Sequence, residues 1–229
     1  HRGPDGSGYY RDKLCALGHT RLSIIDLTGG SQPMANEDGT LWLTFNGEIY
    51  NYVELGDELR ARGHVLKTQS DSEIIIHAYE EWGVDCFTRM NGQWAIGLWD
   101  SRRKELVLSR DRLGIRPLYY TIHDNRLLFA SEVKAILADR SVPREPDPQG
   151  LREILTFWSP IAPRTAFAGI RQLKAGHYSV VSAGRRMADI ETRPYWSPGF
   201  APTAGAGAAS TAGEEENAHA LREKLVDAA

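Results

Sequence analysis

The distribution of apolar and polar positions divides the first part of the chain into extended segments and a loop. Residues 14–25 have the composition of a strand that is broken near Gly18, and residues 41–45 (LWLTF) form a second, mostly apolar strand. Polar and turn-forming residues over 27–39 predict the loop between them. The chain is therefore expected to start with β structure.

Two helices are predicted directly after these strands. In residues 53–62, leucines lie one helical turn apart, and charged residues are spaced four apart. The second helix begins with the pattern of a capping box at Ser70 and Glu73, continues with a row of apolar residues on one face, and ends at Gly83. We expect both helices to pack on a sheet through their apolar faces.

The second half of the chain returns to strands. Residues 93–131 contain four short apolar segments separated by charged or Asp/Asn turns, which predicts a meander of antiparallel pairs. Short helices are expected over 132–138 and 148–158, and a late strand over 177–181. Strands, then helices, then strands again predict an α+β domain.

Composition changes abruptly near residue 197. Residues 197–216 are mostly Ala, Gly, Pro, Ser and Thr, which predicts a linker between an N-terminal domain (1–196) and a new amphipathic helix (217–229). The chain opens with His1 inside a Gly/Pro-rich turn and stops within a helical pattern. We therefore expect a piece of a longer protein, with residues 217–229 as the first helix of its second domain.

Composition and charge exclude several classes of protein. With 41% hydrophobic and 25% charged residues, the chain is typical of globular proteins, and a net charge of −3 gives no reason to expect nucleic acid or an anionic membrane as a partner. No apolar run is long enough to span a bilayer. Two cysteines are too few for a secreted disulfide scaffold, so we expect a cytoplasmic protein.

Three groups of polar residues are candidates for binding or catalysis. Arg21 is a lone arginine between apolar residues, although spacing alone favours a solvated strand end. Asn46 and Gly47, followed by Glu48, end an apolar strand and have suitable donors for an oxyanion, although Asn-Gly alone favours a hairpin turn. Asp71 lies in a first helical turn, where the helix dipole alone accounts for an acid.

No complete catalytic apparatus is visible in the sequence. Cys15 and Cys86 have no base beside them and are interpreted as inert, buried thiols. The seven histidines show none of the close spacings typical of a zinc site, so no metal is expected. A G-x-S-x-G elbow and a phosphate-binding P-loop are also absent from the sequence.

Six motifs in register nevertheless resemble one family. In chain order they are HRGPDGSG, GHTRLSIIDLTGGSQPM, FNGEIYNY, SDSE, RDRLGIRPLYY and FASEVKAIL. Together they resemble the glutaminase domain of glutamine-hydrolysing asparagine synthetases, from His1 to about Trp196. The resemblance implies a four-layer αββα sandwich of the N-terminal-nucleophile hydrolase type, with two antiparallel sheets between helical layers.

The resemblance also implies roles for the scattered polar residues. Arg21 would bind the α-carboxylate of glutamine and Asp71 its α-ammonium, while Asn46 and Gly47 would stabilise the oxyanion. Glu48 would lie against the substrate. The residues expected to line the same pocket through backbone and apolar contacts are Leu22, Ser23, Ile24 and Ile25.

The nucleophile implied by the resemblance is an N-terminal cysteine whose own α-amino group is the general base, and we expect it upstream of His1. Neither Cys15 nor Cys86 can replace it, because neither carries a free α-amino group. A second domain would bind ATP and Mg²⁺ and use the ammonia to amidate aspartate. This fragment is expected to need no cofactor of its own, and a homodimer is left open.

Several alternatives remain open at this point. The same front domain occurs in β-lactam synthetases and in enzymes that amidate peptides or surface sugars, and the acceptor site of the second domain is what separates these enzymes. A glutamine-binding domain that has lost its nucleophile is a rival from another class. A stand-alone amidase is a further alternative.

Overall fold

The computed structural model of the chain describes residues 3, 5–21, 30–184, 189–199 and 213–227. They belong to two units, residues 1–197 and 198–229. The first unit contains all the strands found among the described residues, and the second contains one helix, α6 (Glu214–Asp227). The helix begins inside the region expected as linker, most of which (200–212) lies outside the described residues.

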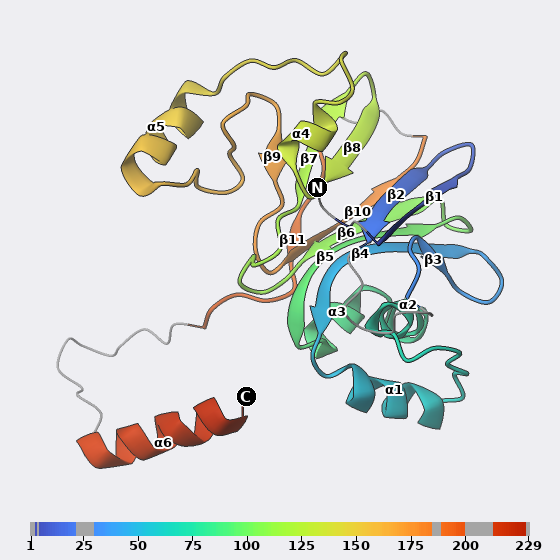
Figure 1. The fold of residues 1–229 in the computed structure, drawn as a ribbon, viewed down its shortest axis with the longest axis vertical. Helices are drawn as coiled ribbons and strands as arrows, with labels where there is room; N and C mark the ends of the chain where they lie inside the picture. The colour runs from blue at the N-terminus through green and yellow to red at the C-terminus, as the bar shows by residue number, and fades with distance from the viewer. Residues whose placement is uncertain (1–2, 4, 22–29, 185–188, 200–212, 228–229) are drawn as a thin grey trace. The chain divides into compact units, whose positions relative to one another are not determined.

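A large antiparallel sheet forms the centre of the first unit (Figure 1). Its strand order is β11-β10-β6-β5-β4-β3. The strands are β3 (Met34–Ala35), β4 (Leu41–Ile49), β5 (Gly92–Asp100), β6 (Glu105–Arg110), β10 (His177–Ser182) and β11 (Arg193–Pro194). The pairs β4–β5 and β5–β6 are the longest and place two nine-residue strands in the middle of the sheet.

Two smaller antiparallel sheets complete the β structure of the described residues. One pairs β1 (Gly6–Arg11) with β2 (Ala16–Arg21) over six residues each. The other has the order β8-β7-β9, with β7 (Tyr119–His123), β8 (Arg126–Ala130) and β9 (Arg171–Gln172). The predicted meander over 93–131 is therefore two hairpins that lie in different sheets, because the chain leaves the central sheet between β6 and β7.

Helices cover the sheets on both outer sides. The helices of the first unit are α1 (Tyr52–Ala61), α2 (Asp71–Trp82), the 3₁₀ turn η1 (Gly83–Asp85), α3 (Cys86–Arg89), α4 (Val133–Ile136) and α5 (Pro148–Phe157). In Figure 1, α1, α2 and α3 lie below the central sheet and α4 lies beside β7 and β8. The expected helices are confirmed, with ends that differ by one or two residues.

Three hydrophobic clusters show how these layers pack. The first lies between α1–α3 and one face of the central sheet and includes Leu43, Phe45, Ile49, Leu59, Ile75, Phe87 and Met90. The second joins the opposite face to the smaller sheets and includes Leu17, Trp99, Leu106, Leu108, Leu118 and Tyr120. The third, with Ile136, Val142 and Ile170, packs α4 against β7 and β8. The layer order is helix, sheet, sheet, helix, as expected for an αββα sandwich.

Two local predictions were wrong. The strand predicted to end at Phe45 continues through Asn46-Gly47 to Ile49, because each of these residues pairs with β5. Asn-Gly is therefore part of the strand and not a hairpin turn. The predicted break at Gly18 is also absent, since Gly18 pairs with Tyr9 inside an uninterrupted strand.

The capping box at the start of α2 is confirmed only in its first half. The Ser70 hydroxyl accepts a hydrogen bond from the backbone N–H of Ser72 at 3.2 Å. The Glu73 carboxylate instead accepts from the N–H groups of Lys67 and Thr68, at 2.8 and 2.7 Å. Glu73 therefore orders the loop before the helix. The capping-box pattern had instead predicted a contact of its carboxylate with the first turn of the helix.

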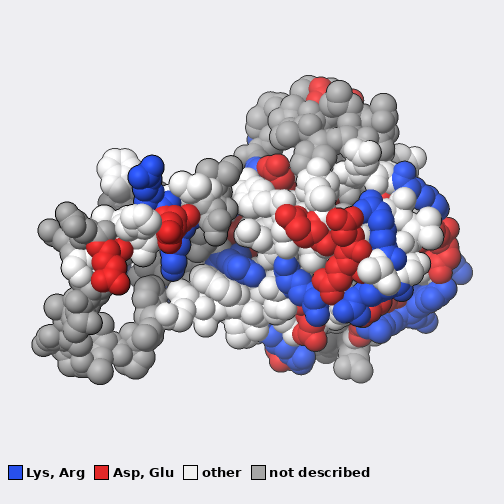
Figure 2. Space-filling model, turned by 90° about the horizontal axis from the view of Figure 1, so that it is seen from below, with Lys and Arg blue, Asp and Glu red and all other residues white. Residues whose placement is uncertain are grey.

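The surface over the helical side of the first unit carries both charge signs. Figure 2, seen from below, shows Lys and Arg side chains interspersed with Asp and Glu. Arg62 pairs with Glu58 and Glu81, and Arg60 pairs with Asp57. Interspersed charges of both signs produce no extended field of one sign on this face. No helix among the described residues is long and apolar enough to cross a membrane.

Candidate active site

The outer edge of β4 is the centre of the candidate site. The neighbouring strand β3 pairs only with Trp42 and Leu43, so it covers only the first half of this edge. Further along this edge, side chains instead of a neighbouring strand accept hydrogen bonds from the backbone N–H groups of β4. The side-chain Oε1 of Gln32 accepts a hydrogen bond from Phe45 N–H at 2.6 Å, and the Asp71 carboxylate accepts one from Ile49 N–H at 3.1 Å.

The N–H group of Gly47 lies between the N–H groups of Phe45 and Ile49 along β4. In an antiparallel ladder, alternate residues direct their N–H groups to the same edge. Since Phe45 and Ile49 point away from β5, Gly47 N–H points in the same direction, into the gap between Gln32 and Asp71. The position also requires glycine, because a Cβ there would lie 2.0 Å from the backbone oxygen of Gln93.

The side chains of Asn46 and Glu48 lie on the face of β4 turned away from the helices. Side chains alternate along a strand, and Leu43, Phe45 and Ile49 occupy the helix-facing side. On the other face, Thr44 is within 3.3 Å of His19 Nδ1 on β2. Asn46 and Glu48 therefore extend toward the layer that contains β2.

The strand β2 brings Arg21 to the same region. Tyr10, which pairs with Leu17, stacks on Trp42, and His19 contacts Thr44. β2 and β4 thus run side by side in the same direction. Two residues beyond the contact of His19 with Thr44, the next residues on this face are Arg21 on β2 and Asn46 on β4. Burial lowers the pKa of His19, and the nearby Arg21 guanidinium lowers it further, in keeping with a cationic group at this end of β2.

Asp71 lies at the other side of the site, as the first residue of α2. Its side chain is almost completely buried, and that burial raises the pKa of its carboxyl group. The N–H groups of Ile49 and Ser72 work in the opposite direction, and the Glu48 carboxylate raises the pKa further. A buried carboxylate whose charge is poorly compensated is well suited to a cationic ligand group.

The structure thus places five of the expected residues around one stretch of β4: Arg21, Asn46, Gly47, Glu48 and Asp71. The pocket-lining residues expected next to Arg21 are Leu22, Ser23, Ile24 and Ile25, and they lie outside the described residues.

Gln32 is a residue of this site that sequence reasoning missed. Its amide connects Phe45 N–H, beside Asn46, to the hydroxyl of Ser72, beside Asp71, at 2.6 and 3.2 Å. A glutamine in a polar loop gives no signal of such a bridge. Gln32 fixes the spacing between the strand and the helix that carry the two ends of the site.

Asp111 was also missed, and it holds β5 in position behind Gly47. Its fully buried carboxylate accepts hydrogen bonds from the backbone N–H groups of Leu113, Ile115 and Arg116, at 2.9 to 3.1 Å. Asp111 N–H also donates to the carbonyl of Trp94, the residue opposite Gly47. A buried acid in an RDRLGIR segment could have been suspected only from its position after an apolar strand.

Neither cysteine is activated. Burial, helped by the Asp12 carboxylate, raises the pKa of Cys15 to about 12. Cys86 is fully buried in the core between the helices and the central sheet, and that burial raises its pKa as well. Because the thiolate is the nucleophile, both residues are interpreted as structural thiols, although only Cys86 is fully buried and Cys15 is half-buried.

Comparison with known proteins gives consistent results. The family model of the glutamine amidotransferase domain matches residues 1–196. The chain is 41% identical to asparagine synthetase [glutamine-hydrolyzing] 3 of Bacillus subtilis, over 77% of this chain and 29% of that protein. It is 37% identical to amidase chry2 of Gibberella zeae, over 100% of this chain and 33% of that protein. The chain thus spans about a third of the length of these relatives.

A solved structure shows the same fold. Glutamine phosphoribosylpyrophosphate amidotransferase from B. subtilis, complexed with ADP and GMP, superimposes with a TM-score of 0.52. The two chains are 19% identical, over 76% of this chain and 35% of the other. The expected fold class, a four-layer αββα sandwich with antiparallel sheets, is confirmed.

Proposed function

We infer, since the chain belongs to the glutamine amidotransferase domain family, that this domain hydrolyses the side-chain amide of glutamine and releases ammonia. The observation that carries the mechanism is the N–H of Gly47 at the open edge of β4, between the N–H groups taken up by Gln32 and Asp71. A backbone donor held rigidly in a sheet is ready for an oxyanion before the reaction starts.

In the proposed mechanism, Asn46 and Gly47 share the oxyanion. When the amide carbon becomes tetrahedral, its oxygen takes a negative charge, which the Gly47 N–H and the Asn46 side-chain amide stabilise. Both residues are fixed by their pairing with Trp94 and Ala95 of β5. Fixed dipoles of this kind do not have to reorganise during the reaction, which is why they stabilise a transition state efficiently.

Arg21 and Asp71 are proposed to recognise the amino-acid end of the substrate. A guanidinium can hold the α-carboxylate through two parallel hydrogen bonds. Asp71 offers a negative charge to the α-ammonium, and Glu48 lies near enough to Asp71 to influence its pKa. One cation and one anion at the same site select a zwitterion over a simple amide.

The nucleophile is proposed to be an N-terminal cysteine that is not among these 229 residues, because Cys15 and Cys86 are both held as thiols. Its α-amino group would take the thiol proton. The sulfur then bonds to the amide carbon, the C–N bond breaks, and ammonia leaves with that proton. Water hydrolyses the resulting thioester to glutamate and the free thiol.

The complete protein is proposed to use this ammonia to amidate aspartate in a separate ATP- and Mg²⁺-dependent domain. Support comes from the asparagine synthetases, although the chain spans only 29% of the B. subtilis relative. The same proposal includes a domain boundary at residue 196, a linker over 197–216 and a helix over 217–229 that starts the second domain. It also includes a cytoplasmic location and a homodimer. Two free cysteines agree with a reducing compartment.

A direct test measures glutamate and ammonia release from glutamine by the complete protein. The wild type should hydrolyse glutamine, and replacement of its N-terminal cysteine by alanine should abolish hydrolysis. The 229-residue chain alone should bind L-glutamine without hydrolysing it. Hydrolysis that persists without that cysteine, or that is lost on replacing Cys15, would contradict the proposal.

A further inference from the structure

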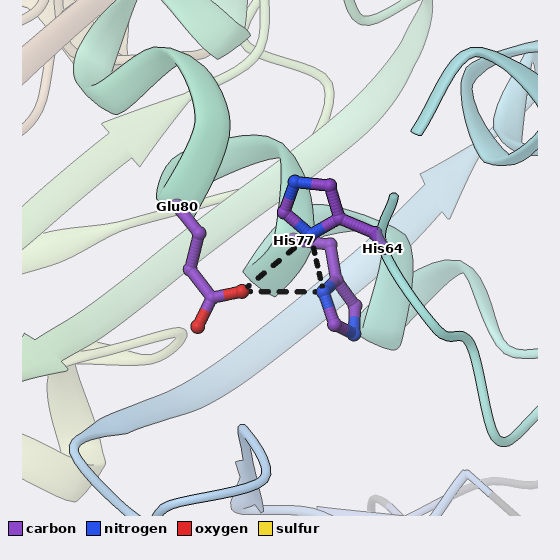
Figure 3. A group of neighbouring side chains, drawn as sticks. All are labelled: His64, His77 and Glu80. Carbon is purple, nitrogen blue, oxygen red and sulfur yellow. Dashed lines mark hydrogen bonds and ion pairs between the residues drawn. The ribbon is translucent and has the colours of Figure 1, made fainter. Parts of the chain in front are cut away.

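Two histidines that are distant in sequence come together behind the candidate active site. His64 lies in the loop after α1, and His77 lies in the second turn of α2. Their Nδ1 atoms are 3.0 Å apart (Figure 3). The histidines show no zinc-type spacing along the chain, because the fold, and not a local motif, brings these two rings together.

Glu80 completes a group of three donor atoms. Its Oε2 lies 3.2 Å from His77 Nδ1 and 3.8 Å from His64 Nδ1 (Figure 3). The other carboxylate oxygen, Oε1, accepts a hydrogen bond from the Asn36 side chain at 2.8 Å. Glu80 is thus oriented with a single oxygen toward the two imidazoles.

The outer nitrogen of each histidine faces a carboxylate. His64 Nε2 is 3.2 Å from Glu81, and His77 Nε2 is 3.3 Å from Glu37. With the proton of each neutral ring on Nε2, facing these carboxylates, both Nδ1 lone pairs are available to an ion beside Glu80; without an ion, one Nδ1 carries the proton of the His64–His77 hydrogen bond. Carboxylates behind the histidines are also the usual second shell of a metal site.

We propose that His64 Nδ1, His77 Nδ1 and Glu80 Oε2 bind one divalent transition-metal ion of the Zn²⁺ type. In a tetrahedral site with bonds of about 2.0–2.2 Å, ligand atoms lie about 3.3–3.6 Å apart. The observed separations of 3.0, 3.2 and 3.8 Å fall around that range. Imidazole ligands favour Zn²⁺, Co²⁺ or Ni²⁺ over Mg²⁺ and Ca²⁺. A water molecule would take the fourth position.

The charges around the group favour a cation. Carboxylate oxygens of Glu37, Glu73 and Glu80 lie 3.2 to 3.9 Å from the ring nitrogens of His77, and Glu81 lies 3.2 Å from His64 Nε2. A second group, made of Glu37, Glu73 and His77, also approaches metal geometry. It is the weaker candidate, because both Glu73 oxygens already accept hydrogen bonds from the loop at Lys67 and Thr68.

Metal binding would fasten the loop after α1 to the helix that carries Asp71. His77 follows Asp71 by six residues, or about 9 Å along the helix axis. The ion would therefore be a structural element of the helical layer, outside the glutamine site. Its binding is independent of whether the domain hydrolyses glutamine.

Co²⁺ titration of the untagged 229-residue chain, after removal of metals with EDTA, tests the proposal. Co²⁺ should bind with one equivalent and give the intense visible spectrum of tetrahedral cobalt. His64→Gln and Glu80→Gln should abolish that spectrum, and Glu81→Gln should weaken binding about 10- to 100-fold. The matched control is His219→Gln, which removes another histidine paired with a glutamate, Glu223, and should change nothing.

Thermal unfolding provides a measurement that needs no variant. Zn²⁺ should raise the unfolding midpoint of the native chain above its value in EDTA, because a ligand that binds only the folded state stabilises it. Equal midpoints, or Co²⁺ binding that survives both His64→Gln and Glu80→Gln, would overturn the proposal. The histidine pair would then hold a proton only.

Discussion

The carboxylate of Asp71 accepts a hydrogen bond from the backbone N–H of Ile49 at 3.1 Å. This contact joins the first turn of α2 to the last residue of β4. It keeps a buried negative charge beside Glu48, two residues from Asn46. One acid therefore both closes the edge of the strand and is available to the proposed substrate ammonium.

Replacing Asp71 by asparagine should separate these two roles. The amide oxygen of asparagine can still accept from Ile49 N–H, so the chain should fold, but the charge for the ammonium is lost. A hydrogen bond to a charged group contributes about 1.5–3 kcal/mol, so glutamine should bind about 10- to 100-fold more weakly. Calorimetric titration of the 229-residue chain measures this. Asp57→Asn, at an exposed acid on α1, is the control, and unchanged glutamine affinity in folded Asp71→Asn would contradict the assigned role.

The same variant should change the dependence of stability on pH. Burial raises the pKa of Asp71 above its unfolded value of about 3.9, so the folded state holds this proton to a higher pH than the unfolded chain does. The contribution of Asp71 to stability is therefore lost as pH rises through the folded pKa. Asp71→Asn should gain stability relative to wild type between about pH 4 and about pH 7. Urea unfolding at both pH values measures the difference, and a gain at the lower pH instead would refute it.

Gly47→Ala should be poorly tolerated. Its Cβ would lie 2.0 Å from the Gln93 oxygen and 2.8 Å from the Trp94 Cα, and backbone atoms paired within a sheet cannot move away easily. Overpacking of this kind costs about 1–3 kcal/mol or more. The matched control is Gly18→Ala on β2, where a Cβ would meet no atom within 4 Å. Equal urea midpoints for the two variants would show that β4 and β5 are not held this closely.

The sequence indicated candidate site residues but not what positions them. The interpretation of Asn46-Gly47 as a hairpin turn was wrong. The local signal for a hairpin was overridden by pairing with β5, which is more than forty residues away in the chain. Gln32 and Asp111 were missed for the same reason, since each acts through backbone groups that only the folded chain brings near. His64 and His77 likewise show no pairing until α2 packs beside the loop.

Other predictions needed only local information and were confirmed. Ser70 caps α2 through a side-chain oxygen that accepts a backbone N–H group. Gly83 ends α2 with a positive φ of 57°, a conformation that favours glycine. Cap residues act within one helical turn of their own position, which is why spacing alone identifies them.

Cys15 should react slowly with alkylating reagents. A pKa of about 12 in place of 9.0 lowers its thiolate fraction about 1,000-fold at mildly alkaline pH. We expect iodoacetamide to label Cys15 and Cys86 only after urea unfolding, with peptide mass spectrometry locating the label. Rapid labelling of native Cys15 would instead identify an activated thiol and weaken the case for a nucleophile outside these 229 residues.

Asn46 and Gly47 are the proposed donors to the oxyanion of glutamine hydrolysis, and the proposed mechanism depends on them more than on any other residue. The most direct measurement compares asparagine synthesis from glutamine and from free ammonia in the complete protein carrying Asn46→Ala. Loss of one oxyanion donor should lower the glutamine-dependent rate about 100- to 1,000-fold and leave the ammonia-dependent rate unchanged. Equal loss of both rates, or loss of neither, would contradict the assignment.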